Sequence, residues 1–355
     1  MSHALDTARF RFDPPMPLRH PHVQSILASS GLRARTIRGR ATAMLRAAEP
    51  LVLDCGDGAR LLGYLSVPNR APRGLIVLLH GWEGSVESHY MISMAGRAFE
   101  AGFEVFRLNF RDHGGTHSLN RELFHSCRLD EVANAAAAIA ERRARAATFV
   151  VGYSLGGNFA LRVAAKAPAL GLNLTKAVAI CPVLKPHSTM EALERGFWIY
   201  REYFLRRWRR SLLAKAAAFP GVYDFGDLRR FRTLTETTAF FVQRYTEYPD
   251  LDSYLDGYAV TGDVLAGLTV PTWLIAARDD PVIPIADLDA VARSDALHIT
   301  LAPRGGHCGF LEDLRLESWL DRCVIGELER AAADAEALSS AASQRTSTAG
   351  RRSTL

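Results

Sequence analysis

The feature that most constrains the fold is an alternation of short apolar runs with stretches of helical pattern, which begins near residue 51. Two of the runs, LIVLL at 75–79 and TFVVG at 148–152, are apolar at nearly every position, as in strands covered on both faces. Alternating strands and helices imply crossover connections and parallel pairing. We therefore predict an α/β fold with a mostly parallel central sheet flanked by helices. The expected strands are 51–54, 61–67, 75–79, 105–108, 148–151, 177–180, 273–276 and 298–301.

The alternation is interrupted once, and segments of different character lie at both ends of the chain. The core is predicted at 51–184 and 267–330, and the helical, aromatic and basic stretch 185–266 between its two parts is predicted to be an inserted cap. Residues 1–50, rich in Arg and Pro, are expected to form an extended N-terminal arm. Residues 331–355 are rich in Ala, Ser and Thr and are expected to be a disordered tail.

The most distinctive part of the cap is RGFWIYREYFLRRWRR at 195–210, where aromatic and Arg residues alternate at helical spacing. One interpretation is a helix whose aromatic side chains pack on the core while the Arg stems cover them. Another is a helix that faces a membrane or an acyl chain, since basic amphipathic helices lie at lipid surfaces. Nucleic-acid binding is not expected, because no recognisable nucleic-acid module accompanies the segment.

Composition excludes several classes of protein. The 355 residues, 48% of them hydrophobic, can bury a large core together with an inserted subdomain. A formal charge of +5, from 43 Lys+Arg against 38 Asp+Glu, is too small an excess to indicate nucleic acid. The five cysteines are odd in number, widely separated and without CxxC spacing, so neither a disulfide framework nor a zinc site is expected.

The sequence also bears on location. Its first residues lack the apolar run of about seven or more residues found in a secretory signal. No window approaches the roughly 18 to 20 consecutive apolar residues of a spanning helix. We therefore expect a cytoplasmic protein, with peripheral membrane contact through the cap left open and the oligomeric state undetermined.

The strongest chemical signal is the motif Gly152-Tyr153-Ser154-Leu155-Gly156, which follows an apolar run and precedes a helical pattern. A G-x-S-x-G on a tight strand-to-helix turn exposes the serine hydroxyl, and side chains at the glycines would clash with the neighbouring strand and helix. This context predicts Ser154 as the nucleophile of an α/β-hydrolase fold.

A serine nucleophile needs a base and a supporting acid, which in this fold follow in the order Ser, Asp or Glu, His. His307 follows the run HITLA and two glycines that let the imidazole turn inward, so it is the predicted base. Asp279 and Asp280 both follow the run TWLIAA. Asp280, four residues before Pro284, is the predicted acid, and Asp279 is predicted to buttress the turn.

The oxyanion of the tetrahedral intermediate requires two amide donors, one after the nucleophile and one after an earlier strand. These are predicted to be the Leu155 and Trp82 amides, with His80 supporting the loop that carries Trp82.

A second loop, NFRDHGGTH at 109–117, would lie near the same rim. His113 and His117 have the spacing of zinc ligands on a helix, but Gly114-Gly115 indicates a loop, so Asp112 and His113 are predicted to support the site and no metal is expected.

Six stretches resemble the YheT-like branch of the α/β-hydrolases, which includes the ABHD-type lipases and the yeast medium-chain alcohol acyltransferases. They are PHVQSI (21–26), LHGWEGS (79–85), NFRDHGGTHSLNRELFHS (109–126), GYSLGGN (152–158), ARDDPVIP (277–284) and GGHCGF (305–310). The resemblance implies hydrolysis of carboxylic esters, with small-molecule or acyl-lipid esters as substrates and no cofactor. It does not extend to the aromatic and basic helix of the cap or to an N-terminal membrane anchor.

The predicted reaction is two-step acyl transfer from an ester to Ser154 and then to water. Two rival hypotheses remain open: an acyltransferase that passes the acyl group to an alcohol, and a binding protein that keeps the fold without its chemistry. Dehalogenases and epoxide hydrolases are excluded, because they carry an aspartate where this chain has Ser154.

Overall fold

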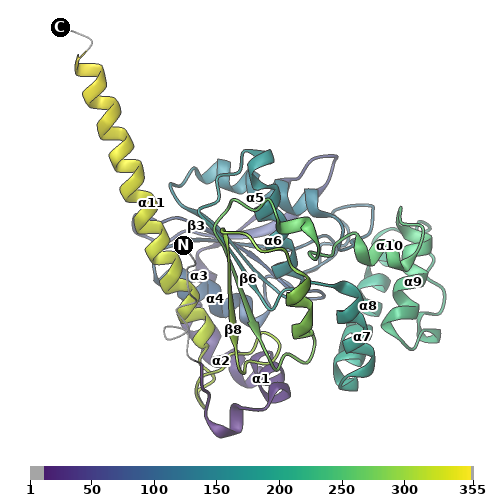
Figure 1. Cartoon of the computed structure of the whole chain (residues 1–355). Helices are drawn as coiled ribbons and strands as arrows, with labels where there is room; N and C mark the ends of the chain where they lie inside the picture. Colours follow the sequence, from purple (N-terminus) through teal and green to yellow (C-terminus); the bar gives the residue numbers. More distant parts are fainter. Residues whose placement is uncertain (1–11, 353–355) are drawn as a thin grey trace.

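The computed structural model describes residues 12–352 and contains a single twisted eight-stranded sheet (Figure 1). The strand order is β1-β2-β4-β3-β5-β6-β7-β8. All neighbours from β4 to β8 pair in parallel, whereas β1 and β2 add an antiparallel edge. The bounds are β1 Ala48–Asp54, β2 Arg60–Ser66, β3 Leu75–Leu79, β4 Glu104–Leu108, β5 Thr148–Tyr153, β6 Lys176–Ile180, β7 Thr272–Ala277 and β8 Leu297–Ala302. The prediction of a mostly parallel sheet is confirmed, and every predicted strand overlaps an observed one.

Helices cover both faces of the sheet. One face packs against α4 (His89–Glu100) and α11 (Trp319–Arg352), and the other against α5 (Leu129–Arg143) and α6 (Leu155–Lys166). Within β3, Ile76 and Leu78 belong to the first layer, whereas the alternating residues Leu75, Val77 and Leu79 belong to the second. A strand covered on both sides has no solvent face, which explains the uninterrupted apolar run.

Four helices inserted between β6 and β7 lie together beside the sheet (Figure 1): α7 Pro186–Arg195, α8 Trp198–Ala218, α9 Leu234–Tyr245 and α10 Leu251–Asp256. Short 3-10 helices occur at Met16–Leu18, Ala167–Leu170, Leu228–Arg230, Asp263–Leu265 and Ile285–Ala290. The inserted helices bury an apolar cluster that includes Trp208 of α8 and Phe241 of α9 and that they share with Leu123 of the core. We call α7–α10 the cap.

The aromatic and basic segment of the cap faces in two directions. Phe204 stacks on Trp82 of the core with ring centroids 5.1 Å apart, and Trp208 meets the same indole edge-on at 5.3 Å. In contrast, Trp198 is 59% exposed and Tyr203 is 48% exposed. The interpretation of aromatic side chains packed on the core therefore holds for part of α8 only.

The expectation of an extended N-terminal arm is wrong for the described part of residues 1–50. This region is helical, with α1 Pro21–Ala28, α2 Gly31–Arg40 and α3 Thr42–Arg46, and residues 1–11 lie outside the described range. Each helix is too short to produce a periodic pattern, and helices of this length depend on tertiary packing. Here Ile37, Ala41 and Met44 provide that packing by joining the core layer that contains α4.

The expectation of a disordered tail is also wrong, because α11 continues as a helix to Arg352. Its first turns are anchored by buried Leu320, Val324 and Leu328. Since a helix propagates easily from a formed nucleus, the Ala-rich sequence that follows extends it. No helix within residues 12–352 is long and apolar enough to cross a membrane.

A buried ion pair joins the cap to the core. Lys215 of α8 is fully buried, and its ammonium donates to the Asp112 carboxylate at 2.7 Å and to the carbonyl oxygens of Asn120 and Glu122 at 2.7 and 2.9 Å. All three donors of the ammonium are therefore satisfied. Asp112 also accepts the Phe124 amide at 2.8 Å, so the ion pair fixes the 112–124 loop as well as α8.

We predict that Lys215→Met destabilises the protein by about 3–5 kcal/mol, because it leaves the Asp112 carboxylate buried without its cation. Arg206→Met removes the exposed pair with Glu202 on the same helix and should cost less than about 0.5 kcal/mol. Urea denaturation measures both values. Equal losses in the two variants would contradict this role for Lys215.

Candidate active site

The turn between β5 and α6 holds Ser154 in a strained conformation, with φ 54° and ψ −117°. A Cβ on Gly152 would lie 1.9 Å from the Gly156 carbonyl oxygen, and one on Gly156 would lie 2.3 Å from that of Leu79. Neither position can carry a side chain. The predicted strand-turn-helix context of Ser154, and the clash predicted at its flanking glycines, are confirmed.

Ser154 belongs to a continuous chain of hydrogen bonds. Its Oγ lies 3.0 Å from His307 Nε2, and His307 Nδ1 lies 2.9 Å from Asp280 Oδ2. Because a carboxylate can only accept, Nδ1 carries the proton and Nε2 presents its lone pair to the Ser154 hydroxyl. Burial by itself lowers the pKa of His307, but the Asp280 carboxylate and the Cys308 sulfur raise it, and the net shift is upward.

The two neighbouring aspartates have different partners. The side chain of Asp280 is 2% exposed, and its second oxygen accepts the amides of Val282 and Ile283 at 2.8 and 3.0 Å. Asp279 accepts the Gly306 amide at 2.9 Å, and burial raises its pKa. Asp280 therefore faces the imidazole, whereas Asp279, predicted to buttress its own turn, bonds the loop that carries His307.

The loop after β3 carries Trp82, which lines the same two cavities as Ser154. The Gly81 amide donates to the Tyr90 hydroxyl at 2.9 Å, and the Glu83 amide donates to His113 Nε2 at 3.2 Å. The Trp82 amide between them has no partner within residues 12–352. Leu155 is the first residue of α6, and an amide at that position has no acceptor within its own helix. Both amides are thus available to a ligand.

The predicted support residues contact the loops around the site. His80 donates from Nδ1 to the Gly81 carbonyl at 2.7 Å and accepts the Phe110 amide at 3.2 Å. His113 donates from Nδ1 to the Arg111 carbonyl at 2.7 Å. Burial lowers the pKa of His113 to about 4 and that of His80 well below 6.5, so both are neutral near pH 7.

His113 and His117 do not converge as zinc ligands would. His117 Nε2 lies 2.9 Å from the Ser211 hydroxyl of the cap, whereas His113 holds the loop of Glu83. Asp112 bonds Lys215 of the cap and the Phe124 amide, so it joins the cap to the 112–124 loop.

Residues of α1 that the sequence analysis left without a role hold the loop of His307. Ser25 Oγ accepts the His307 amide at 2.8 Å. The Gln24 side chain is fully buried and bonds both the amide and the carbonyl of Leu311, at 2.7 and 3.0 Å. Gly306 has φ 56°, and a Cβ there would lie 2.4 Å from the Pro21 carbonyl oxygen. The only signal in the sequence was the PHVQSI motif.

We predict that Ser25→Ala lowers kcat about tenfold with little change in KM. The variant leaves the His307 amide without its acceptor, which costs about 1–3 kcal/mol and shifts the imidazole. Steady-state kinetics measures the effect, and Thr42→Ala, which removes an exposed hydroxyl of the same N-terminal region, is the control. A change in KM alone would argue against a positioning role.

Glu83 lies next to Trp82, is only 7% exposed and has a left-handed backbone with φ 55°. Its Oε1 lies 4.0 Å from His113 Nε2. Burial raises the pKa of Glu83 from 4.5 to about 7, against the opposing effect of Arg207. Near neutral pH this carboxyl is therefore partly protonated.

This shift predicts a pH-dependent stability. The folded pKa lies above the unfolded one, so the unfolded chain loses this proton first and the protein loses stability as the pH rises from 4.5 to 7. The loss is on the order of 3 kcal/mol. Glu83→Gln removes the ionisable carboxyl and with it this loss. The difference in unfolding free energy between variant and wild type should therefore widen from pH 5 to pH 8 in urea denaturation. The exposed Glu49→Gln should give a constant gap, and a constant gap for Glu83→Gln would refute the assignment.

Two chambers meet at Ser154 under the cap. The smaller, about 90 Å³, is mostly apolar, and Leu155, Met190 and Leu193 are among its lining residues. The larger, about 590 Å³, has His307, Ser25, Ile199 and Arg207 in its wall. We call them the narrow and the wide chamber.

The sequence profile of the alpha/beta hydrolase family matches residues 76–317, which include Ser154, Asp280 and His307. The chain belongs to this family. The predicted α/β-hydrolase fold is thus confirmed, with a mostly parallel sheet whose carboxyl edge carries Ser154, Asp280 and His307.

Individual members of the alpha/beta hydrolase family resemble the chain over most of its length. A protein of Escherichia coli (strain K12) named "Putative esterase YheT" is 27% identical over 69% of this chain and 74% of its own. The human "Protein ABHD15" is 25% identical over 72% of this chain and 54% of its own. The solved Pyrobaculum calidifontis esterase has a TM-score of 0.53 at 18% identity and covers 92% of this chain and 99% of its own. The predicted relation to the YheT and ABHD branch is confirmed, and the chain is an α/β hydrolase with esterase relatives.

Proposed function

We propose that this protein hydrolyses carboxylic esters through an acyl-enzyme formed on Ser154. The proposal is supported by two consecutive hydrogen bonds, 3.0 Å from Ser154 Oγ to His307 and 2.9 Å from His307 to Asp280. A serine in this arrangement can be deprotonated as it attacks, which a hydroxyl alone cannot achieve near neutral pH.

In the first step, Ser154 Oγ attacks the ester carbonyl while His307 Nε2 takes the hydroxyl proton. The amides of Leu155 and Trp82 stabilise the oxyanion, and Asp280 stabilises the imidazolium. The C–O bond to the alcohol then breaks, and His307 gives its proton to the leaving oxygen. Water repeats the sequence on the acyl-enzyme and releases the acid.

The alcohol and acyl parts of the substrate occupy different chambers. The leaving oxygen must receive a proton from His307, so the alcohol part extends into the wide chamber, whose wall contains His307. The acyl chain then occupies the narrow chamber beside Leu155, where the lining is mostly apolar. We propose esters with a short to medium acyl chain and a bulkier alcohol, and an acyl lipid fits this description.

Hydrolysis of p-nitrophenyl esters from acetyl to palmitoyl tests the proposal. We expect a rate maximum at short to medium chain length, and a loss of at least about 10⁴-fold in kcat for Ser154→Ala with an unchanged circular dichroism spectrum. Ser294→Ala, at the start of the turn before β8, is the matched control. Near-normal turnover by Ser154→Ala would rule out the mechanism.

The identity of the acyl acceptor is read from the products of the same reaction with ethanol added. Hydrolysis predicts the free acid as the main product. An ethyl ester as the main product would instead support an acyltransferase, which uses the same acyl-enzyme.

The assignment of the acyl chain to the narrow chamber predicts opposite behaviour for two matched variants. Met190→Trp reduces the narrow chamber and should shift the rate maximum to shorter acyl chains. Ile199→Trp reduces the wide chamber and should leave the chain-length profile unchanged while raising KM for bulky alcohols. A reversed result would exchange the roles of the chambers.

We also propose that the cap contacts lipid, since exposed Trp198 and Tyr203 lie on α8 and Tyr203 is part of the wide chamber's wall. Exposed aromatic side chains beside the wide chamber would bring an amphiphilic ester from the lipid surface to the site. Co-sedimentation with phosphatidylglycerol vesicles should occur and weaken in Trp198→Ala, and its absence would contradict lipid contact.

A further inference from the structure

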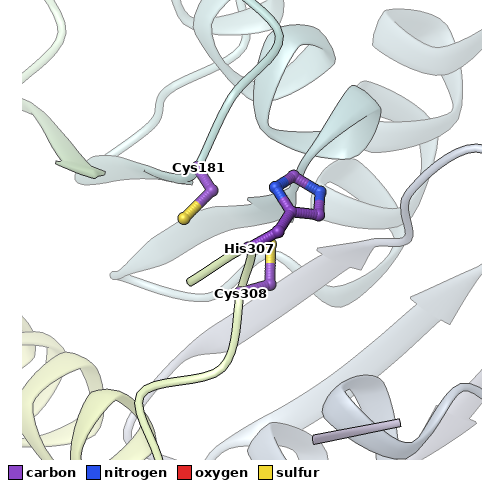
Figure 2. Close-up of side chains that lie close together, drawn as sticks. All are labelled: Cys181, His307 and Cys308. Atoms are coloured by element: carbon purple, nitrogen blue, oxygen red, sulfur yellow. The ribbon is translucent and has the colours of Figure 1, made fainter. Parts of the chain in front are cut away.

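Two cysteines lie beside the histidine of the site. Cys181 follows the end of β6, and Cys308 follows His307 directly, so the fold brings together residues that are far apart in the sequence. The two sulfurs and a ring nitrogen of His307 all lie within 4.8 Å of one another, and Figure 2 shows the three side chains close together. No metal site was predicted here, because the two cysteines are far apart in the sequence and form no local motif.

The thiols of Cys181 and Cys308 bond to each other, Cys308 also bonds to His307, and both thiols make only long contacts with the backbone. Both cysteines are free of disulfides, and Cys181 is 1% and Cys308 9% exposed. Their contacts with the backbone, from Cys181 Sγ to the Gly306 carbonyl and from Cys308 Sγ to the Ile180 carbonyl, are both 3.9 Å long. Thiols that make such long hydrogen bonds give up little when a stronger ligand replaces the proton.

Two thiolates and one imidazole form a donor set that suits zinc. In a tetrahedral site the Zn–S and Zn–N bonds of about 2.3 and 2.0 Å place the ligand atoms about 3.5 Å apart. The three ligand atoms already lie within 4.8 Å of one another, so a contraction of at most about 1.3 Å reaches this geometry. An exogenous ligand such as water would complete the fourth position. His307 and Cys308 both form part of the wall of the wide chamber, which provides a route for the ion.

We propose that Cys181, Cys308 and His307 form a binding site for Zn²⁺, and that the bound ion switches the hydrolase off. On binding, the two thiols release their protons to solvent and the imidazole stays neutral with one proton. If the metal takes Nδ1, that proton moves to Nε2, which can then no longer accept from Ser154. If the metal takes Nε2, the lone pair that serves as the base is occupied. Either geometry stops the reaction.

The inhibitory part rests on the proposed role of His307 as the general base, whereas metal binding does not. The two parts are therefore measured separately. The binding measurement needs no substrate, so it stays informative even if the protein turns over none of the tested esters.

Binding is measured by titrating the full-length protein, stripped of metal by chelator, with Co²⁺ as a spectroscopic probe. We expect one equivalent to produce an intense sulfur-to-cobalt charge-transfer band that Zn²⁺ abolishes by displacement. Cys181→Ser and Cys308→Ser should each lose most of the band, and Cys55→Ser, a buried cysteine elsewhere, should keep it. Cys181→Ala replaces Cys181→Ser if circular dichroism shows misfolding. Absence of the band in wild type, or its persistence in both cysteine variants, would overturn the site.

Inhibition is measured as ester hydrolysis in buffers of defined free Zn²⁺, with each variant compared with its own rate in EDTA. Wild type and Cys55→Ser should lose at least about tenfold in rate and recover it in EDTA. Cys181→Ser and Cys308→Ser should lose less than about twofold. Equal inhibition of all four proteins would place the inhibitory ion elsewhere, and full activity of wild type with the site occupied would overturn the switch.

Discussion

The rest of the site depends on the imidazole of His307 being held between two groups at once. Asp280 fixes the proton on Nδ1, and Ser154 then faces the lone pair of Nε2. The three residues follow β5, β7 and β8, which lie near one another in the sheet. Because the strands are parallel, their carboxyl ends meet at one edge, and side chains distant in sequence come within hydrogen-bonding distance.

The elements around this edge restrict how far the imidazole can move. Asp279 holds the Gly306 amide from one side, and Ser25 of α1 holds the His307 amide from the other. The glycine at 306 is explained by the close approach of α1 and its positive φ, more than by the flexibility that the sequence suggested. Helix α1 thus restrains the loop that carries His307.

The sheet, and Ser154, His307 and Asp280 as site residues, could be predicted because each is marked by a local sequence pattern. Apolar runs such as 75–79 report burial on both faces, and the glycines at 152 and 156 report a backbone contact that excludes side chains. Helices α1 to α3 could not be predicted, because tertiary packing stabilises them and they are too short for periodicity. The same limit applies to Lys215 with Asp112 and to Cys181 with Cys308, which are contacts between distant residues that no local pattern encodes. The tail was predicted wrongly because its composition suggested disorder, although α11 supplied a helical nucleus.

Labelling with a fluorophosphonate tests directly whether Ser154 is a nucleophile activated by His307. The adduct should be located by mass spectrometry on the peptide containing Ser154, and its rate of formation should fall at least about 100-fold in His307→Gln. An adduct on another residue would show that Ser154 is not the nucleophile, and an equal rate of labelling in His307→Gln would show that His307 does not activate it.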